Sequence, residues 1–100
     1  NPKPVGYLLS RIIKDELEIV SLLVKKKYRR RGIGVALLKE LYMLAGRKKI
    51  TKIILEVSVQ NYAAKMLYEK FKFKKVGLRK NYYSTKDKKI DAEIMQISII

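Results

Sequence analysis

The chain has 100 residues, 48% of them hydrophobic, a formal net charge of +15 at pH 7, and neither cysteine nor histidine. This length supports a single domain with one core. Without cysteine and histidine the chain has no disulfides, none of the usual zinc sites and no Cys/His or Ser/His catalytic pair, so its chemistry must use Glu, Asp, Tyr, Lys, Ser or the backbone.

The positive charge favours polyanionic partners, such as RNA, DNA, acidic protein surfaces or phosphorylated cofactors. A lysine-rich surface composition gives the same charge without any such partner. No run of about 18 apolar residues occurs, so no membrane span is predicted. No signal peptide is visible at the start of the chain, and the lack of cysteine fits a reducing compartment, so we expect a cytoplasmic protein.

The first half of the chain predicts a hairpin followed by a helix. Residues 5–14 and 18–24 are rich in Val, Ile and Leu and are separated by Asp15-Glu16, which indicates two strands. After the basic stretch KKKYRRRGIG at residues 25–34, apolar residues recur at the three- to four-residue spacing of a helix, at Ile33, Leu37, Leu41 and Leu44. We expect this helix to end near Gly46.

The second half predicts a buried strand, a helix and two further strands. The β-branched run at residues 53–59 suits a strand covered on both faces. Asn61 stands where an N-cap is needed, and a second amphipathic helix is indicated by Ala64, Leu67, Tyr68 and Phe71. Residues 73–79 and 92–100 are predicted strands with a polar loop between them. The result is one α/β domain over residues 1–100.

The basic stretch favours an anion site at the start of the first helix. A helix start presents N–H groups that lack partners, and the positive end of its dipole attracts phosphate. Gly32 and Gly34 let the main chain approach an anion and supply the dihedral angles of an anion nest. The stretch matches neither G-x-x-x-x-G-K-[ST] nor G-x-G-x-x-G. A solvated, charged turn is the alternative at this point.

Further motifs add to this one in a consistent order. RRRGIG matches R/Q-x-x-G-x-G/A, LEVSVQNYAAKMLYEKFKF follows it, and RKNYY comes near the end. Together they resemble the GNAT superfamily of acetyltransferases, in particular its RimI-type ribosomal-protein alanine N-acetyltransferase and archaeal N-terminal acetyltransferase branch. The resemblance covers residues 5–100. It implies a GNAT fold, in which a mixed central sheet with splayed parallel strands is flanked by helices.

The resemblance implies an acetyl-CoA site between the parallel strands at 18–24 and 51–59, without a metal. The pantetheine arm would pair with the backbone of Leu22, Leu23 and Val24, where an N–H would stabilise the oxyanion. The pyrophosphate would lie on N–H groups of the loop, with a charge-assisted contact from Arg29. The loop residues are Arg30, Arg31, Gly32, Ile33, Gly34 and Val35. Asn61 would contact the CoA arm, although it also fits a plain N-cap.

The same resemblance implies roles for four side chains. Glu56 would be the general base, and the alternative is a cross-strand partner for a lysine. Tyr68 would protonate the leaving thiolate, and the alternative is an aromatic side chain that packs at a helix edge. Tyr82 and Tyr83 would contact the backbone of the acceptor, whereas exposed tyrosines in a polar loop also suit RNA stacking.

The implied reaction is acetyl transfer from acetyl-CoA to the N-terminal α-amine of a ribosomal or nascent protein. Freeing an α-amine at pH 7 costs roughly 1–1.4 kcal/mol, whereas freeing a lysine costs about 4.6 kcal/mol, which favours the α-amine. The alternatives are a lysine or small-amine acetyltransferase, a basic RNA- or ribosome-binding module, and a domain that binds CoA without turnover.

The chain departs from the family pattern at its start. Family members normally begin with a strand, one or two helices and another strand before the segment that opens this chain. We therefore expect an open sheet edge at residues 5–14. A fragment, a complementing subunit or a homodimer that associates through this edge would each account for the difference. The first residue is Asn rather than Met, which fits a fragment or a processed product.

Overall fold

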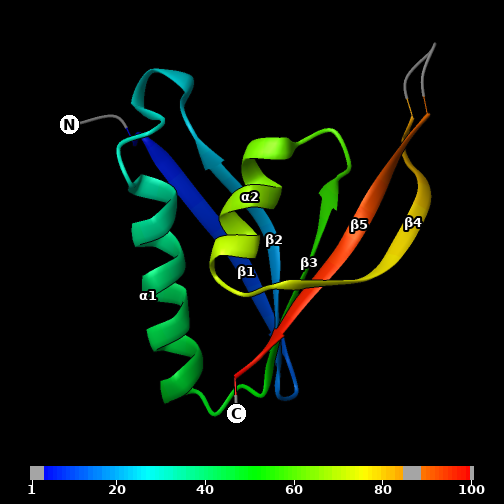
Figure 1. The fold of residues 1–100 in the computed structure, drawn as a ribbon. Helices are drawn as coiled ribbons and strands as arrows, with labels where there is room; N and C mark the ends of the chain where they lie inside the picture. Colours follow the sequence, from blue (N-terminus) through cyan, green and yellow to red (C-terminus); the bar gives the residue numbers. More distant parts are fainter. Residues whose placement is uncertain (1–3, 85–88, 100) are drawn as a thin grey trace.

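The computed structural model describes residues 4–84 and 89–99. Figure 1 shows two helices in front of a twisted sheet. In chain order the elements are β1 (Gly6–Ile13), β2 (Glu16–Val24), the 3-10 helix η1 (Lys26–Tyr28), α1 (Ile33–Arg47), β3 (Lys52–Ser58), α2 (Tyr62–Lys70), β4 (Lys74–Ser84) and β5 (Lys89–Ser98). The predicted order of strands and helices is confirmed.

The sheet is mixed, with the strand order β1-β2-β3-β5-β4. β2 and β3 are parallel, and the other neighbouring pairs are antiparallel. The connection from β2 to β3 passes through α1, as a parallel pair requires. β1 is the outermost strand of the described sheet, which agrees with the predicted open edge at residues 5–14.

Several predicted boundaries were wrong. The hairpin turn lies at Lys14 and Asp15, where Lys14 has a φ of 58°, and Glu16 already belongs to β2. The end of α1, by contrast, was predicted correctly: the helix ends at Arg47, next to Gly46, and Lys49 takes the left-handed conformation with a φ of 55°. β4 runs to Ser84, so residues 80–84 form a strand instead of a polar loop, and β5 begins at Lys89.

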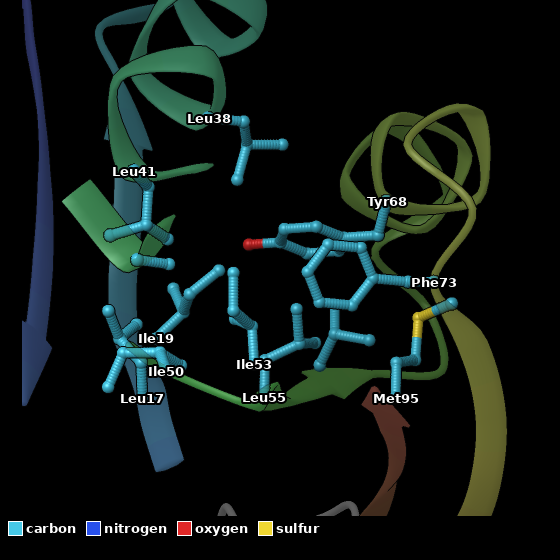
Figure 2. Close-up of a cluster of buried hydrophobic side chains, with 12 residues drawn as sticks. Leu17, Ile19, Leu38, Leu41, Ile50, Ile53, Leu55, Tyr68, Phe73 and Met95 are labelled. Atoms are coloured by element: carbon cyan, nitrogen blue, oxygen red, sulfur yellow. The ribbon is translucent and has the colours of Figure 1, made fainter. Parts of the chain in front are cut away.

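Both helices pack on one face of the sheet, where alternate residues of the central strands form the core. Figure 2 shows these side chains between the helices and the strands. The cluster comprises Leu17, Ile19, Leu38, Leu41, Ala45, Ile50, Ile53, Leu55, Val57, Tyr68, Phe73 and Met95. Burial of this apolar surface is the main force that fixes the helices on the sheet.

The opposite face of the sheet carries no helix in the described residues. Ile54 and Glu56 of β3 are only partly buried there, and Leu9 and Ile13 of β1 are exposed. The prediction that the strand at 53–59 is covered on both faces was therefore wrong for this part of the chain. No helix among residues 4–84 and 89–99 is long and apolar enough to cross a membrane.

Tyr42 ties α1 to the end of α2. Its hydroxyl donates to the Phe71 carbonyl at 2.9 Å, and its ring stacks on the Phe71 ring with the centroids 5.6 Å apart. Burial raises the pKa of Tyr42 to about 12, from an ordinary value of 10.0. The folded state therefore favours the protonated phenol.

We predict that Tyr42→Phe lowers the free energy of unfolding at pH 7 by about 1 kcal/mol, because one hydrogen bond is lost. Above the unfolded pKa of about 10, the unfolded state loses a proton that the folded state keeps up to about pH 12. The stabilisation from Tyr42 is thus complete below pH 10 and declines as the pH rises. Urea unfolding between pH 7 and 11.5 measures it, with the exposed Tyr62→Phe as control. Parallel pH curves for wild type and Tyr42→Phe would contradict this assignment.

Candidate active site

β2 and β3 pair at one end and part at the other. Their parallel register runs from Glu16↔Lys52 to Ile19↔Leu55 and extends no further in the described residues. Figure 1 shows the two strands opening into a V, with α2 in front of the gap. The facing edges of residues 20–24 and 56–58 are not used for pairing with each other, so a ligand with amide groups can pair with them as a strand does.

A β-bulge in β2 accounts for the opening. Leu9 of β1 lies opposite Ser21, but Ser10 lies opposite Ile19, so Val20 is the extra residue. A bulge bends its strand and increases the local twist. The bulge also reverses the alternation of side chains between the two faces of the sheet. Ile19 is buried in the core, and Leu22 packs against the same core, although a regular strand would place these two residues on opposite faces. Leu22, Leu23 and Val24 thus lie on the arm of β2 beyond the bulge.

The N-terminus of α1 stands at the wide end of the V. Its N-cap is Gly32, no side chain caps the helix, and no acidic residue lies in the first turn. The first helical hydrogen bond runs from the Ala36 N–H to the Gly32 carbonyl at 2.9 Å, which leaves the N–H groups of Ile33, Gly34 and Val35 without helical partners. Arg30 and Gly32 both have positive φ, a backbone shape that turns N–H groups toward an anion.

The two glycines of the loop have different structural roles. Gly32 has a φ of 78°, which an L side chain rarely adopts, and space around it is open. Gly34 lies against α2, because a Cβ at this position would stand 3.0 Å from Leu67 Cδ2. Gly34 therefore brings the helices close together, in addition to any contact that it makes with an anion.

The basic residues around the loop are partly occupied by contacts within the protein. Arg29 Nε donates to the Val24 carbonyl at 2.8 Å and so braces the end of β2. Lys27 and Arg31 lie over the Tyr28 ring at 5.9 and 5.5 Å from its centroid. The contact of Arg29 with a pyrophosphate stays a prediction, and the sequence did not indicate its bracing role.

Glu56 lies on β3 at the point where β2 departs, on the face without helices. Its side chain is one-quarter exposed, and both carboxylate oxygens accept from Nη1 of Arg79 at 3.2 Å. The alternative expectation was a lysine as cross-strand partner, whereas the structure gives Glu56 an arginine from β4. Sequence reasoning missed Arg79, because its proximity to Glu56 depends on the order β3-β5-β4.

Tyr68 lies on the helix-covered face, with 5% of its surface exposed. Its ring contacts the Phe73 ring at 5.5 Å between centroids. Figure 2 shows the hydroxyl pointing toward Leu38 and Ile19, which is the side of the diverging strand β2. Tyr68 therefore packs in the core, as the alternative expectation held, and its hydroxyl points toward α1 and β2.

Asn61 is the N-cap of α2, since its Oδ1 accepts from the Ala64 N–H at 3.2 Å. This bond does not use the amide nitrogen of the side chain, which can still donate to a ligand. Tyr82 is exposed, and the Arg79 guanidinium lies 4.4 Å from its ring centroid. The side chain of Tyr83 lies outside the described part of the chain, and its acceptor contact stays a prediction.

No cluster of three or more potential metal ligands occurs in the described residues. The functional groups around the V are instead backbone N–H groups, a carboxylate, a phenol and guanidinium groups. This set suits acyl transfer from a phosphate-bearing donor, because it combines an anion site with a candidate base and a candidate acid.

Residues 1–73 match the acetyltransferase (GNAT) family. The chain belongs to the GNAT acetyltransferase family. It is 34% identical over 99 residues to the [ribosomal protein bS18]-alanine N-acetyltransferase of Escherichia coli K12, covering 99% of this chain and 67% of that protein. It is also 39% identical to an N-alpha-acetyltransferase of Saccharolobus solfataricus, covering 80% of this chain and 56% of that protein.

Solved structures give the same GNAT assignment. The crystal structure of the ribosomal-protein-S18-alanine N-acetyltransferase from Escherichia coli matches with a TM-score of 0.88 over 95% of this chain and 61% of that chain. Arabidopsis thaliana Naa50 in complex with the bisubstrate analogue CoA-Ac-MVNAL is 28% identical, with a TM-score of 0.84 over 94% of this chain and 61% of that one. The chain thus spans between 56% and 67% of these relatives.

We predict opposite effects for two Gly→Ala substitutions in this GNAT domain. Gly32→Ala should lower the free energy of unfolding by about 1 kcal/mol, because alanine is strained at a φ of 78°. Gly46→Ala, inside α1 with open space around it, should raise it by roughly 0.5–1 kcal/mol. Urea denaturation measures both. Equal effects of the two substitutions would show that the left-handed N-cap is not maintained in solution.

Proposed function

We propose that this domain transfers the acetyl group of acetyl-CoA to the N-terminal α-amine of a protein. The observation that carries the proposal is the V between β2 and β3, with the uncapped N-terminus of α1 at its wide end. An extended donor with amide groups in its arm and phosphates at one end fits both features together. Thus the arm pairs with residues 22–24, while the pyrophosphate lies on the N–H groups from Arg30 to Val35.

Glu56 and Tyr68 flank the proposed thioester from opposite faces of the sheet. Glu56 lies on the sheet face that carries no helix in the described residues, and Tyr68 projects from α2 toward the other face, with its hydroxyl directed toward Leu38 and Ile19. The amine adds to the thioester carbon to give a tetrahedral intermediate, from which the sulfur leaves as a thiolate that needs a proton. The arrangement therefore separates the proposed base from the proposed acid, so neither blocks the other.

The proposed reaction is a direct attack within a ternary complex. The amine nitrogen forms a bond to the thioester carbon, and the carbon–sulfur bond breaks. The amine proton passes to the Glu56 carboxylate, directly or through one water, and the Tyr68 hydroxyl gives its proton to the departing sulfur. A backbone N–H on the arm of β2 stabilises the negative oxygen of the transition state. Solvent exchange then returns both side chains to their starting states.

The acceptor is proposed from the names of the relatives and from amine chemistry. The Escherichia coli relative is named for alanine of ribosomal protein bS18, and the Saccharolobus solfataricus relative is an N-alpha-acetyltransferase. A ribosomal or nascent chain with a free N-terminus in the cytoplasm is thus the proposed substrate. An α-amine is also easier to deprotonate than a lysine at neutral pH.

Mass spectrometry of acetylated peptides tests the proposed chemistry. Peptides that begin with Ala or Met and contain one lysine should gain one acetyl group at the N-terminus, and the same peptides with blocked N-termini should gain none. Glu56→Gln should lower the rate at least about 10²-fold, the lower end of general-base contributions. Tyr68→Phe should slow release of the thiolate, and the exposed Tyr62→Phe is the control.

Two results would contradict the proposal. One is the absence of product from the wild-type chain, and the other is full activity in both Glu56→Gln and Tyr68→Phe. Acetylation of the lysine in the blocked peptides would instead identify a lysine acetyltransferase with the same fold.

Ligand-dependent stability distinguishes an enzyme from an RNA-binding module. CoA should raise the melting temperature, because it binds the folded state only, and pantetheine without phosphates should raise it less. A module that binds RNA through its basic surface predicts RNA affinity that falls steeply with salt and is unaffected by CoA. No stabilisation by CoA, together with salt-dependent RNA binding, would favour that second function.

A further inference from the structure

Glu56 and Arg79 form an ion pair on the sheet. One guanidinium nitrogen, Nη1, lies 3.2 Å from each carboxylate oxygen, so the arginine holds the carboxylate from one side. The Glu56 side chain is one-quarter exposed and that of Arg79 more than half, so within the described residues the pair is accessible from the sheet face that carries no helix. An acceptor amine that reaches Glu56 must therefore approach Arg79 as well.

Arg79 reaches Glu56 across the intervening strand β5. In the register of the sheet, Ala92 of β5 lies between Arg79 of β4 and Ser58 of β3, and Glu56 lies opposite Ile94. The Arg79 side chain thus crosses β5 at Ala92, which has a small side chain. A larger residue at Ala92, which is fully buried, would obstruct that path.

A bulge in β4, directly after Arg79, also positions the guanidinium of this residue. The register moves from Arg79↔Ala92 to Tyr83↔Ile90, which inserts two extra residues into β4. Asn81 has a φ of 56°, and its N–H donates to Asp91 Oδ1 at 2.8 Å. The guanidinium lies 4.4 Å from the centroid of the Tyr82 ring, a cation–π contact. Arg79 is thus held between an aromatic ring and a carboxylate.

We propose that Arg79 is a positioning residue for acetyl transfer, which holds the Glu56 carboxylate toward the acceptor and places a fixed positive charge beside the amine. This inference rests on the function proposed above. A guanidinium stays charged throughout the working pH range. An amine hydrogen-bonded to Glu56 lies within roughly 6 Å of Nη1, a distance at which a like charge disfavours the ammonium form. The amine must be neutral to attack, so the charge assists deprotonation.

The proton has a defined path in this arrangement. It leaves the amine nitrogen for a Glu56 oxygen, and Arg79 neither gains nor loses a proton. The carboxylate is held by Arg79 before the transfer, and the protonated acid that results binds the guanidinium less strongly. No redox step or additional reactant is involved.

The test compares three variants by kinetics against pH. We expect Arg79→Gln to lower kcat at pH 7 about tenfold, with an unchanged KM for acetyl-CoA. The acidic limb of the pH profile of kcat, which reports ionisation in the enzyme–substrate complex, should move to higher pH by about one unit. Arg79→Lys keeps the charge and should retain the wild-type limb, even if its kcat is lower. Arg11→Gln is the matched control, because Arg11 forms an ion pair with Glu18 on the same sheet face, away from the V.

The outcomes separate this inference from the proposed function. An active wild type, with a shifted limb in Arg79→Gln and an unshifted limb in Arg79→Lys, supports both. If the wild type is active but Arg79→Gln keeps the wild-type kcat and acidic limb, only the role of Arg79 is overturned. The same holds if the limb of Arg79→Lys shifts as that of Arg79→Gln does. An inactive wild type overturns both. Stabilisation by CoA, measured for every variant, verifies that the donor site is folded.

Discussion

The end of strand pairing at Ile19 and Leu55 is the constraint on which the rest of the site depends. Up to that point, β2 and β3 satisfy each other's backbone groups, and beyond it the bulge at Val20 directs β2 away. A buried sheet normally leaves few backbone groups without partners. The facing edges of the V are therefore the place where an extended ligand gains most from pairing with the backbone, and the other parts of the proposed site are arranged around it.

The elements around the V are held by contacts that do not involve a ligand. Gly34 lets α1 approach Leu67 of α2, and Tyr42 joins α1 to Phe71 at the end of α2. On α2, Lys65 forms an ion pair with Glu93 of β5 at 3.2 Å. These contacts fix the start of α1 and the hydroxyl of Tyr68 relative to the strands. A site held in this way needs little rearrangement when the donor binds.

Much of the fold was predictable because it depends on local patterns. The three- to four-residue spacing of apolar residues located α1, and the Asn61 N-cap located the start of α2. The largest boundary error, at residues 80–84, depends on pairing with a strand that comes later in the chain. Residues 80–84 contain polar and charged side chains, yet they form a strand because β5 pairs with them and Asp91 stabilises the bulge at Asn81.

The sequence by itself determined the family of this protein and the residues that carry its motifs, including the loop up to Gly34, Glu56 and Tyr68. These follow from residue types at fixed spacing, which a linear chain displays directly. Only the tertiary structure decided that Glu56 and Tyr68 lie on opposite sheet faces, that Gly34 packs on Leu67 and that Arg79 holds Glu56. The physical reason is that strand order, bulges and register bring together side chains that are far apart in the chain, and no local pattern encodes these distances.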